Sequence, residues 1–302
     1  MPPQQASAEA RNEVRIDKPL APGLYLVATP IGNLEDITLR ALRVLRSVDR
    51  IACEDTRQTQ KLLNHFEIRT PTVSYHMHNE GTRADELLSE LRQGSCIAVV
   101  SDAGTPGVAD PGGQIVAAAI AAGIDVFPVP GANAAINGLI ASGLPAESFT
   151  FHGFLPAKAG QRKTALESLA REGAVHIFYE APHRLLDALA DVSSVFGAAQ
   201  HVVVARELTK LHEEFLRGPV EEVHRQLAAR SQVRGEIVLM FAPSEVGDIS
   251  TEQRPGIAVE VAALIKSEGI AEKDALKRVA RERGIGKSEA YRELQREQNR
   301  RR

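Results

Sequence analysis

The sequence contains little cysteine and no long apolar run. Its 302 residues include two cysteines, Cys53 and Cys96, each within a short apolar stretch. This usage predicts buried free thiols in a reducing compartment rather than a disulfide framework. No run of 18 apolar residues is present, so the sequence predicts no membrane span. Residues 1–18 are polar and lack the apolar centre of a signal peptide, so we expect a disordered tail over 1–20 and a cytoplasmic protein.

Charge is distributed unevenly along the chain. The formal net charge is −3, but residues 271–302 hold eleven Lys and Arg against six Asp and Glu. The segment therefore has a balance of +5, and the remainder of the chain has −8. A nucleic-acid partner would meet a local basic surface near the C-terminus rather than the whole body.

Short apolar runs alternate with helical patterns from residue 23 to residue 241. We expect strands over 23–28, 50–53, 72–75, 96–100, 125–129, 148–152, 175–179, 201–205, 214–216 and 236–241. Helices are expected over 38–48, 58–65, 83–93, 114–120, 134–142, 161–171, 184–196 and 220–230. The pattern predicts two α/β domains, 21–130 and 131–243, the first with a mostly parallel sheet covered by helices on both faces.

One loop stands out within this alternation. Residues 101–113 read SDAGTPGVADPGG and lie between a predicted strand and a predicted helix. Thirteen residues with four glycines and two prolines exceed what a plain strand-to-helix turn needs, although such a turn is the alternative. Because ligands bind at the carboxyl ends of strands in α/β sheets, we interpret this stretch as a ligand loop. Asp110 followed by Pro111 predicts a helix N-cap and first turn.

The C-terminal residues 252–302 form a separate helical pattern. Helices are predicted over 257–268, 272–283 and 287–297, with Gly284-Ile285-Gly286 as a turn. Two helices joined by such a turn resemble a helix-turn-helix, and Arg278 and Arg281 become candidate RNA contacts. A helical hairpin that only caps the body is the alternative.

Seven motifs in order make a specific resemblance. They are VATPIGNLEDIT, IACEDTR, VSDAGTPGVADPG, VPGANA, GFLP, FYEAPHR and RELTKLHEE. Together they resemble the tetrapyrrole methylase superfamily and, within it, the ribosomal small-subunit RNA (cytidine-2′-O)-methyltransferase I family. The resemblance covers residues 21–243, and the tail is similar to that family's helical extension. No G-x-G-x-x-G follows a strand, so a Rossmann fingerprint is missing.

The resemblance implies two α/β domains, a homodimer, and S-adenosylmethionine held between the domains. It also implies methylation of the 2′-hydroxyl of a decoding-centre cytidine in 16S rRNA of the 30S subunit. By motif position, the cofactor-binding residues would be Pro30, Asp102, Ala103, Gly104, Thr105, Val108, Ala132, Asn133, Tyr179 and Glu180. Thr105 stands where tetrapyrrole-acting members often carry Asp, so its role is open.

A sugar hydroxyl needs a general base to become a good nucleophile. Glu54 and Asp55 in CEDTR are favoured, and the other candidates are Glu180, His183, and Glu207 with Lys210. Each has a plainer alternative. Asp55 is also placed to cap a helix, and Glu180 to orient the cofactor only.

Basic residues near the motifs are candidate RNA contacts, namely Arg57, Lys158, Arg162, Arg184 and Lys210. A solvated helix face is the alternative for the cluster at 158–163, and ion pairing is the alternative for Arg184 and Arg206. His76 and His78 form His-x-His, but the chemistry needs no metal and no third ligand is near in sequence, so none is expected. Two further functions stay open: a small-molecule tetrapyrrole methylase, and a non-catalytic, cofactor-sensing nucleic-acid-binding protein.

Overall fold

The computed structural model describes residues 19–76, 80–110, 112–170, 173–242 and 257–283, together with 290, 291 and 294. The chain divides into two compact units, residues 1–243 and residues 244–302, which are described separately. The expected helix over 287–297 lies largely outside the described residues. Among the residues that the structure describes, no helix has the length and apolar character needed to cross a membrane.

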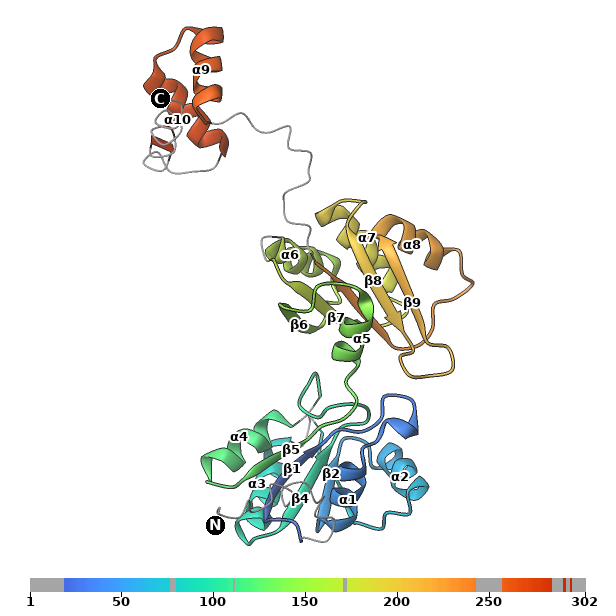
Figure 1. Ribbon diagram of the computed structural model, residues 1–302. Coiled ribbons are helices and arrows are strands. Elements are labelled where there is room, and N and C mark those ends of the chain that lie inside the picture. The colour runs from blue at the N-terminus through green and yellow to red at the C-terminus, as the bar shows by residue number, and fades with distance from the viewer. Residues whose placement is uncertain are drawn as a thin grey trace, which may run out of the picture. The chain divides into compact units, whose positions relative to one another are not determined.

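The first sheet is built from five parallel strands (Figure 1). They are β1 (Gly23–Val27), β2 (Arg50–Cys53), β3 (Thr72–Ser74), β4 (Cys96–Val100) and β5 (Val126–Val129), in the order β3-β2-β4-β1-β5. The helices between them are α1 (Leu39–Ser47), α2 (Thr56–His65), α3 (Glu80–Arg92) and α4 (Gly113–Ala121), with a short 3₁₀ turn over Leu34–Asp36. The expected parallel sheet is confirmed.

Alternate residues of these strands enter two separate apolar cores. Tyr25 and Val27 pack with α1 and α2, whereas Leu24 packs with α3 and α4. The same alternation divides Ala98 from Val99 in β4. Since successive side chains of a strand point to opposite faces, helices must cover both sides of this sheet to bury them.

The second sheet is mixed rather than parallel. Its strands are β6 (Phe149–Phe154), β7 (Val175–Glu180), β8 (His201–Arg206), β9 (Glu214–Pro219) and β10 (Ile237–Phe241), in the order β6-β7-β10-β8-β9. Among these described strands, β6 and β7 pair in parallel, and the other neighbours are antiparallel. The short segment between β8 and β9 is too small for a crossover helix, so these two strands form a hairpin.

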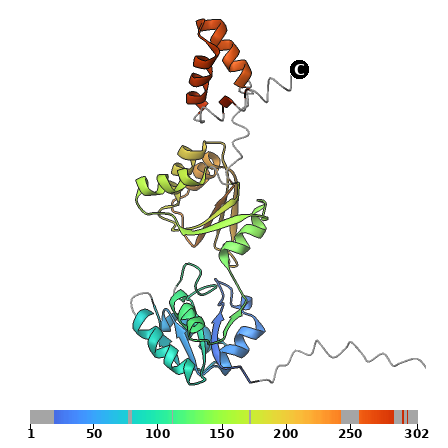
Figure 2. The same ribbon diagram turned by 90° about the vertical axis from the view of Figure 1, so that its left-hand side faces the viewer.

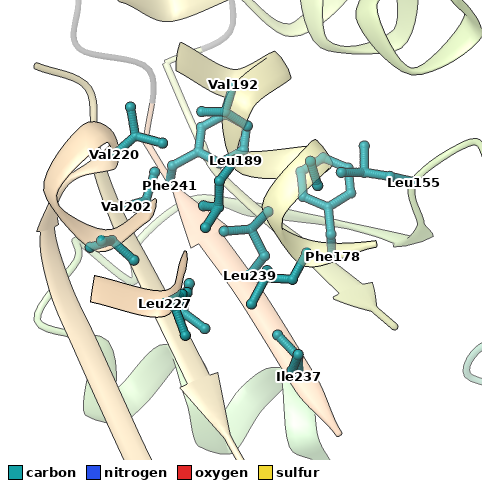
Figure 3. Packing of buried hydrophobic residues seen from close by; sticks show 14 of the residues in the cluster. Leu155, Phe178, Leu189, Val192, Val202, Val220, Leu227, Ile237, Leu239 and Phe241 are labelled. Atoms are coloured by element: carbon teal, nitrogen blue, oxygen red, sulfur yellow. The ribbon is translucent and has the colours of Figure 1, made fainter. Parts of the chain in front are cut away.

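Helices again cover both faces of the second sheet. They are α5 (Ala134–Ser142), α6 (Ala159–Leu169), α7 (Leu185–Phe196) and α8 (Val220–Ala228). Figure 3 shows Leu189 of α7 and Leu227 of α8 packed with Phe178, Leu239 and Phe241 of the strands. On the opposite face, α5 packs against alternate residues of the same strands, with Leu139 and Met240 in one core.

The C-terminal unit contains α9 (Ile257–Glu268) and α10 (Glu272–Arg283), which match the predicted ranges. They pack on each other, as the orange-red helices in Figure 2 show. Val261, Ala275 and Val279 are buried in one cluster together with Ala290 and Leu294. The unit therefore has an apolar core of its own.

Candidate active site

A cavity of about 300 Å³ opens where the strands of the first sheet end. It is lined by Ile31, Ala103–Thr105, Val108–Asp110, Asn133, Ala134, Phe154, Tyr179–Pro182, Leu208 and Gly235–Val238. Residues that follow the first sheet and residues of the second sheet therefore line the same cavity. Its size and mixed apolar and polar lining are those of small-molecule sites, and its place follows the rule for ligands in α/β sheets.

Backbone pairing fixes the glycine-rich loop beside the cavity. The amide of Thr29 donates to the carbonyl of Gly104 at 2.8 Å, and the amide of Gly104 donates back at 3.0 Å. Gly104 has φ 85°, and a β-carbon there would lie 3.2 Å from Ile31 Cγ2. Both conditions favour glycine. Because its own polar groups are paired with Thr29, Gly104 shapes the loop rather than offering its amide to a ligand.

Thr105 ties this loop to the one that follows β5. Its hydroxyl donates to the carbonyl of Ala132 at 3.1 Å and accepts from Asn133 Nδ2 at 3.3 Å. Asn133 in turn caps α5 by accepting from the amide of Ile136. Thr105 therefore acts as a clamp between the two loops.

The predicted cofactor residues gather around the cavity. Seven of them line it: Ala103, Gly104, Thr105, Val108, Asn133, Tyr179 and Glu180. Pro30, Asp102 and Ala132 are adjacent in sequence to lining residues. Their roles toward a cofactor stay predictions. The sequence reasoning missed Phe154, Leu208 and residues 235–238; Phe154 stands in the GFLP motif and Leu208 in RELTK, so both motifs carried the signal.

Carboxylates cluster beyond β2 and β4. Asp55 is the N-cap of α2, where its Oδ1 accepts from the amide of Arg57 at 2.8 Å, so the plainer alternative for this residue is confirmed. Asp102 Oδ1 accepts from the amide of Asp55 at 3.0 Å. Burial, followed by the charge of Asp102, raises the pKa of Glu54, and His76 opposes that rise. His78 lies outside the described residues.

Asp110 differs from its sequence prediction. Helix α4 begins at Gly113 with Gly112 as its N-cap, so Asp110 does not cap it. Gly112 has φ 139°, a conformation open to glycine, and the chain turns there instead. Asp110 lines the cavity. Its burial, followed by the charge of Glu54, raises its pKa to about 6 despite a hydrogen bond with Ser101.

Glu180 is held firmly at the end of β7. Its carboxylate accepts from the amide of Ala181 at 2.8 Å and pairs with Arg184 Nε at 3.3 Å. Burial raises its pKa, and these partners work against the rise. Arg184 also donates to the carbonyl of Leu155. The ion-pair alternative is therefore confirmed for Arg184, and its guanidinium is engaged inside the fold.

The turn between β8 and β9 closes another side of the cavity. Lys210 Nζ contacts Glu207 at 2.8 Å and Glu236 at 3.2 Å. Burial lowers the pKa of Lys210, but these carboxylates outweigh it and the net shift is upward. Glu207 and Thr209 have φ of 53° and 64°, which is strained for residues with a β-carbon. Leu208, between them, lines the cavity.

The other candidate RNA contacts have different surroundings. Arg57 and Lys158 are exposed, on the first turn of α2 and at the N-cap of α6. Arg162 is 4% exposed, and its Nε pairs with Asp191 at 2.7 Å, so the structure contradicts a surface role for it. Arg278 is exposed on α10, while the side chain of Arg281 lies outside the described part of the chain. Arg206 pairs with Glu214 at 3.0 Å, as its alternative predicted.

Comparison with known proteins places the chain in a family. The family model for tetrapyrrole (corrin/porphyrin) methylases matches residues 23–224. Ribosomal RNA small subunit methyltransferase I of Halalkalibacterium halodurans is 50% identical over 276 residues, which cover 89% of this chain and 93% of that protein. The protein of the same name from Synechocystis is 46% identical over 268 residues, which cover 89% of this chain and 95% of that protein.

A solved structure agrees with the fold. Uroporphyrin-III-C-methyltransferase from Thermus thermophilus superposes with a TM-score of 0.52 at 22% identity, covering 77% of this chain and 98% of that one. The sequence matches decide the family, and the fold agrees with them. The chain belongs to the tetrapyrrole methylase superfamily and, within it, to the family of ribosomal RNA small subunit methyltransferase I.

Proposed function

We propose that this chain methylates ribosomal RNA of the small subunit with S-adenosylmethionine as methyl donor. The observation that carries the proposal is 50% identity over 276 residues to a protein named for that reaction. Relatives at this level with near-complete coverage favour an RNA substrate over a tetrapyrrole. The finer proposal, taken from the motif resemblance, is the 2′-hydroxyl of a decoding-centre cytidine in the 16S rRNA of 30S particles.

The cavity suits the methyl donor chemically. Ile31, Val108 and Leu208 give it an apolar wall, and Asp110 and Glu180 place carboxyl groups at its edge. A sulfonium cation is attracted by such carboxyl groups and supplies an electrophilic methyl group. Thr105 and Asn133, by clamping two loops, would hold the binding residues in place without rearrangement at the moment of reaction.

Alignment of the two reacting centres supplies much of the rate in an in-line displacement. Gly104 and Thr29 fix one side of the cavity by backbone pairing, and the strained turn at Leu208 fixes another. The cavity walls also limit water around the acceptor hydroxyl. The chain's contribution is therefore mainly a rigid frame that orients and shields the reactants.

Basic residues supply the proposed RNA contacts. Arg57 and Lys158 are exposed on unit 1, Arg278 is exposed in the basic C-terminal unit, and Arg281 belongs to the same unit by sequence. Arg184 and Lys210 remain secondary candidates because carboxylates already engage them. A homodimer in the cytoplasm completes the proposal, in keeping with the family resemblance.

Methyl incorporation tests the function. Radiolabelled S-adenosylmethionine should transfer its label to 30S particles lacking the modification, and the label should map to a cytidine ribose. Free 16S rRNA and a tetrapyrrole serve as parallel acceptors. Label on the tetrapyrrole alone would support the small-molecule alternative, and no label on any acceptor, with RNA still bound, would support the non-catalytic one.

A further inference from the structure

We propose that Asp110 is the general base of the methyl transfer and takes the proton from the acceptor hydroxyl inside the cavity. The proposal rests on the proposed function. It departs from the sequence prediction, which favoured Glu54 or Asp55. Two observations lead to it: Asp110 lines the cavity, and its charged neighbours are acidic.

Asp110 is placed by the end of the glycine-rich loop. It is half-buried and lines the same cavity as Ala103, Gly104 and Thr105. Ala109, directly before it, has φ 63°, a left-handed conformation that alanine rarely adopts. The loop therefore holds a strained residue at the point that directs Asp110 to the cavity.

The other carboxylates near the cavity are committed to partners. Glu180 holds the amide of Ala181 and the guanidinium of Arg184, and Glu236 pairs with Lys210. Asp55 caps α2, and neither it nor Glu54 is among the cavity-lining residues. Of the described carboxyl groups that line the cavity, Asp110 is the one whose charged neighbours are acidic.

Those neighbours keep the proton affinity of Asp110 high. Glu54 after β2 and Asp102 after β4 both oppose its ionisation, and Tyr179 of β7 interacts with it electrostatically. Ser101 hydrogen-bonds to its carboxyl group, and His76 interacts with Glu54. Its pKa of about 6 is close to neutral pH, where a general base is most effective. Glu54 acts through Asp110 and is thus a positioning residue.

The proton and electron balance of the step is simple. The acceptor oxygen forms a bond to the methyl carbon while the carbon–sulfur bond breaks and its electron pair stays on sulfur. The hydroxyl proton moves to the Asp110 carboxylate, which releases it to solvent afterwards. No oxidant, reductant or metal is needed.

The first experiment compares single-turnover methylation of 30S particles between about pH 5 and pH 9. The wild-type rate should rise with an apparent pKa near 6 and then level. Asp110→Asn should lower the plateau at about pH 8 by about 10²-fold or more and remove the inflection, whereas Asp110→Glu should recover part of the rate. Glu54→Gln should move the inflection to lower pH. Asp85→Asn, an exposed aspartate on α3, is the matched control for loss of one charge and should behave as wild type.

The second experiment does not depend on turnover. Calorimetry with S-adenosylhomocysteine should show that Asp110→Asn binds within a few-fold of wild type. Carbon-13 NMR of the full-length chain labelled with ¹³C-carboxyl aspartate measures the titration directly. The Asp110 signal is assigned as the one that is lost in Asp110→Asn. This signal should titrate near pH 6 in the wild type and at lower pH in Glu54→Gln.

The outcomes separate the two proposals. Asp110→Asn turnover within a few-fold of wild type at about pH 8, or an Asp110 carboxyl that titrates below about 4.5, would overturn the role of Asp110. A wild-type chain that methylates no RNA would overturn the proposed function, and the carboxyl titration would then decide on Asp110 alone. Loss of turnover in Asp55→Asn with wild-type behaviour of Asp110→Asn would return the role to Asp55.

Discussion

Gly104 lines the cavity, and its backbone amide and carbonyl are paired with Thr29. A side chain at φ 85° is strained, and a β-carbon would stand 3.2 Å from Ile31. Gly104→Val should therefore break the pairing with Thr29, displace the loop and abolish binding of S-adenosylmethionine, while the chain stays folded. Calorimetry measures the binding, and circular dichroism the fold.

Gly94 provides the matched control for this substitution. It has φ 90°, and within the described part of the chain no atom lies within 4 Å of the position that a β-carbon would take. It follows α3 and lies outside the cavity lining. Gly94→Val should cost stability of about 1–2 kcal/mol from backbone strain alone and leave the affinity unchanged. Near-normal affinity in Gly104→Val would contradict the placement of the site.

Asp110 should also leave a signature in stability. The folded chain holds the Asp110 proton up to about pH 6, whereas the unfolded chain releases it near 3.8. The folded state thus binds more protons in between, and the free energy of unfolding falls as pH rises through this window. Asparagine cannot ionise, so the free energy of unfolding of Asp110→Asn does not fall in this way. Relative to wild type, it should therefore rise by roughly 2–3 kcal/mol between about pH 4 and about pH 7. Urea unfolding of both chains at the two pH values measures this change. If the difference in free energy of unfolding between variant and wild type is the same at both pH values, the raised pKa is contradicted.

The sequence predicted elements better than side-chain environments. β2 and β4 match their predicted bounds because a short apolar run carries enough local information. The surroundings of Arg162 could not be predicted, since its partner Asp191 is 29 residues away on another helix. Asp110 was misread because Asp-Pro is typical of helix starts, whereas the helical pattern itself, expected over 114–120, agrees with the observed start at Gly113.

At the scale of elements, α6 and α7 are joined by a buried charge pair. Arg162 is 4% exposed and its partner Asp191 is 7% exposed. Removing one partner leaves an uncompensated charge, so Asp191→Ala should lower the free energy of unfolding by about 3–5 kcal/mol. Replacing both with apolar residues, as in Arg162→Met with Asp191→Leu, should restore most of it. Urea unfolding of the single and double variants tests this. If both variants lose the same free energy of unfolding, packing shape rather than charge pairing stabilises the contact between α6 and α7.

At the scale of the whole molecule, the two units should separate in function. The C-terminal unit has its own core built around α9 and α10 and carries local positive charge. A chain ending at Glu252 should bind S-adenosylmethionine normally but bind 30S particles more weakly. Each lost phosphate contact should reduce the slope of log affinity against log salt by roughly 0.7–0.9.

A charge reversal complements the truncation. Arg278→Glu with Arg281→Glu should act in the same direction without deleting a helix. Unchanged methylation rate and salt response in the truncated chain would contradict an RNA role for this unit. The RNA surface would then have to be sought on unit 1, around Arg57 and Lys158.

The strand order of the first sheet has a consequence for synthesis on the ribosome. β1 (Gly23–Val27) is made first but lies between β4 and β5, so its hydrogen-bonding partners begin only at Cys96 and Val126. Until β5 has left the exit tunnel, the apolar residues of β1 have no complete sheet to enter, and loop closure over that distance slows pairing. A nascent chain released before Val129 should therefore stay protease-sensitive and need chaperone protection, whereas one extended past β5 should acquire resistance in a single step.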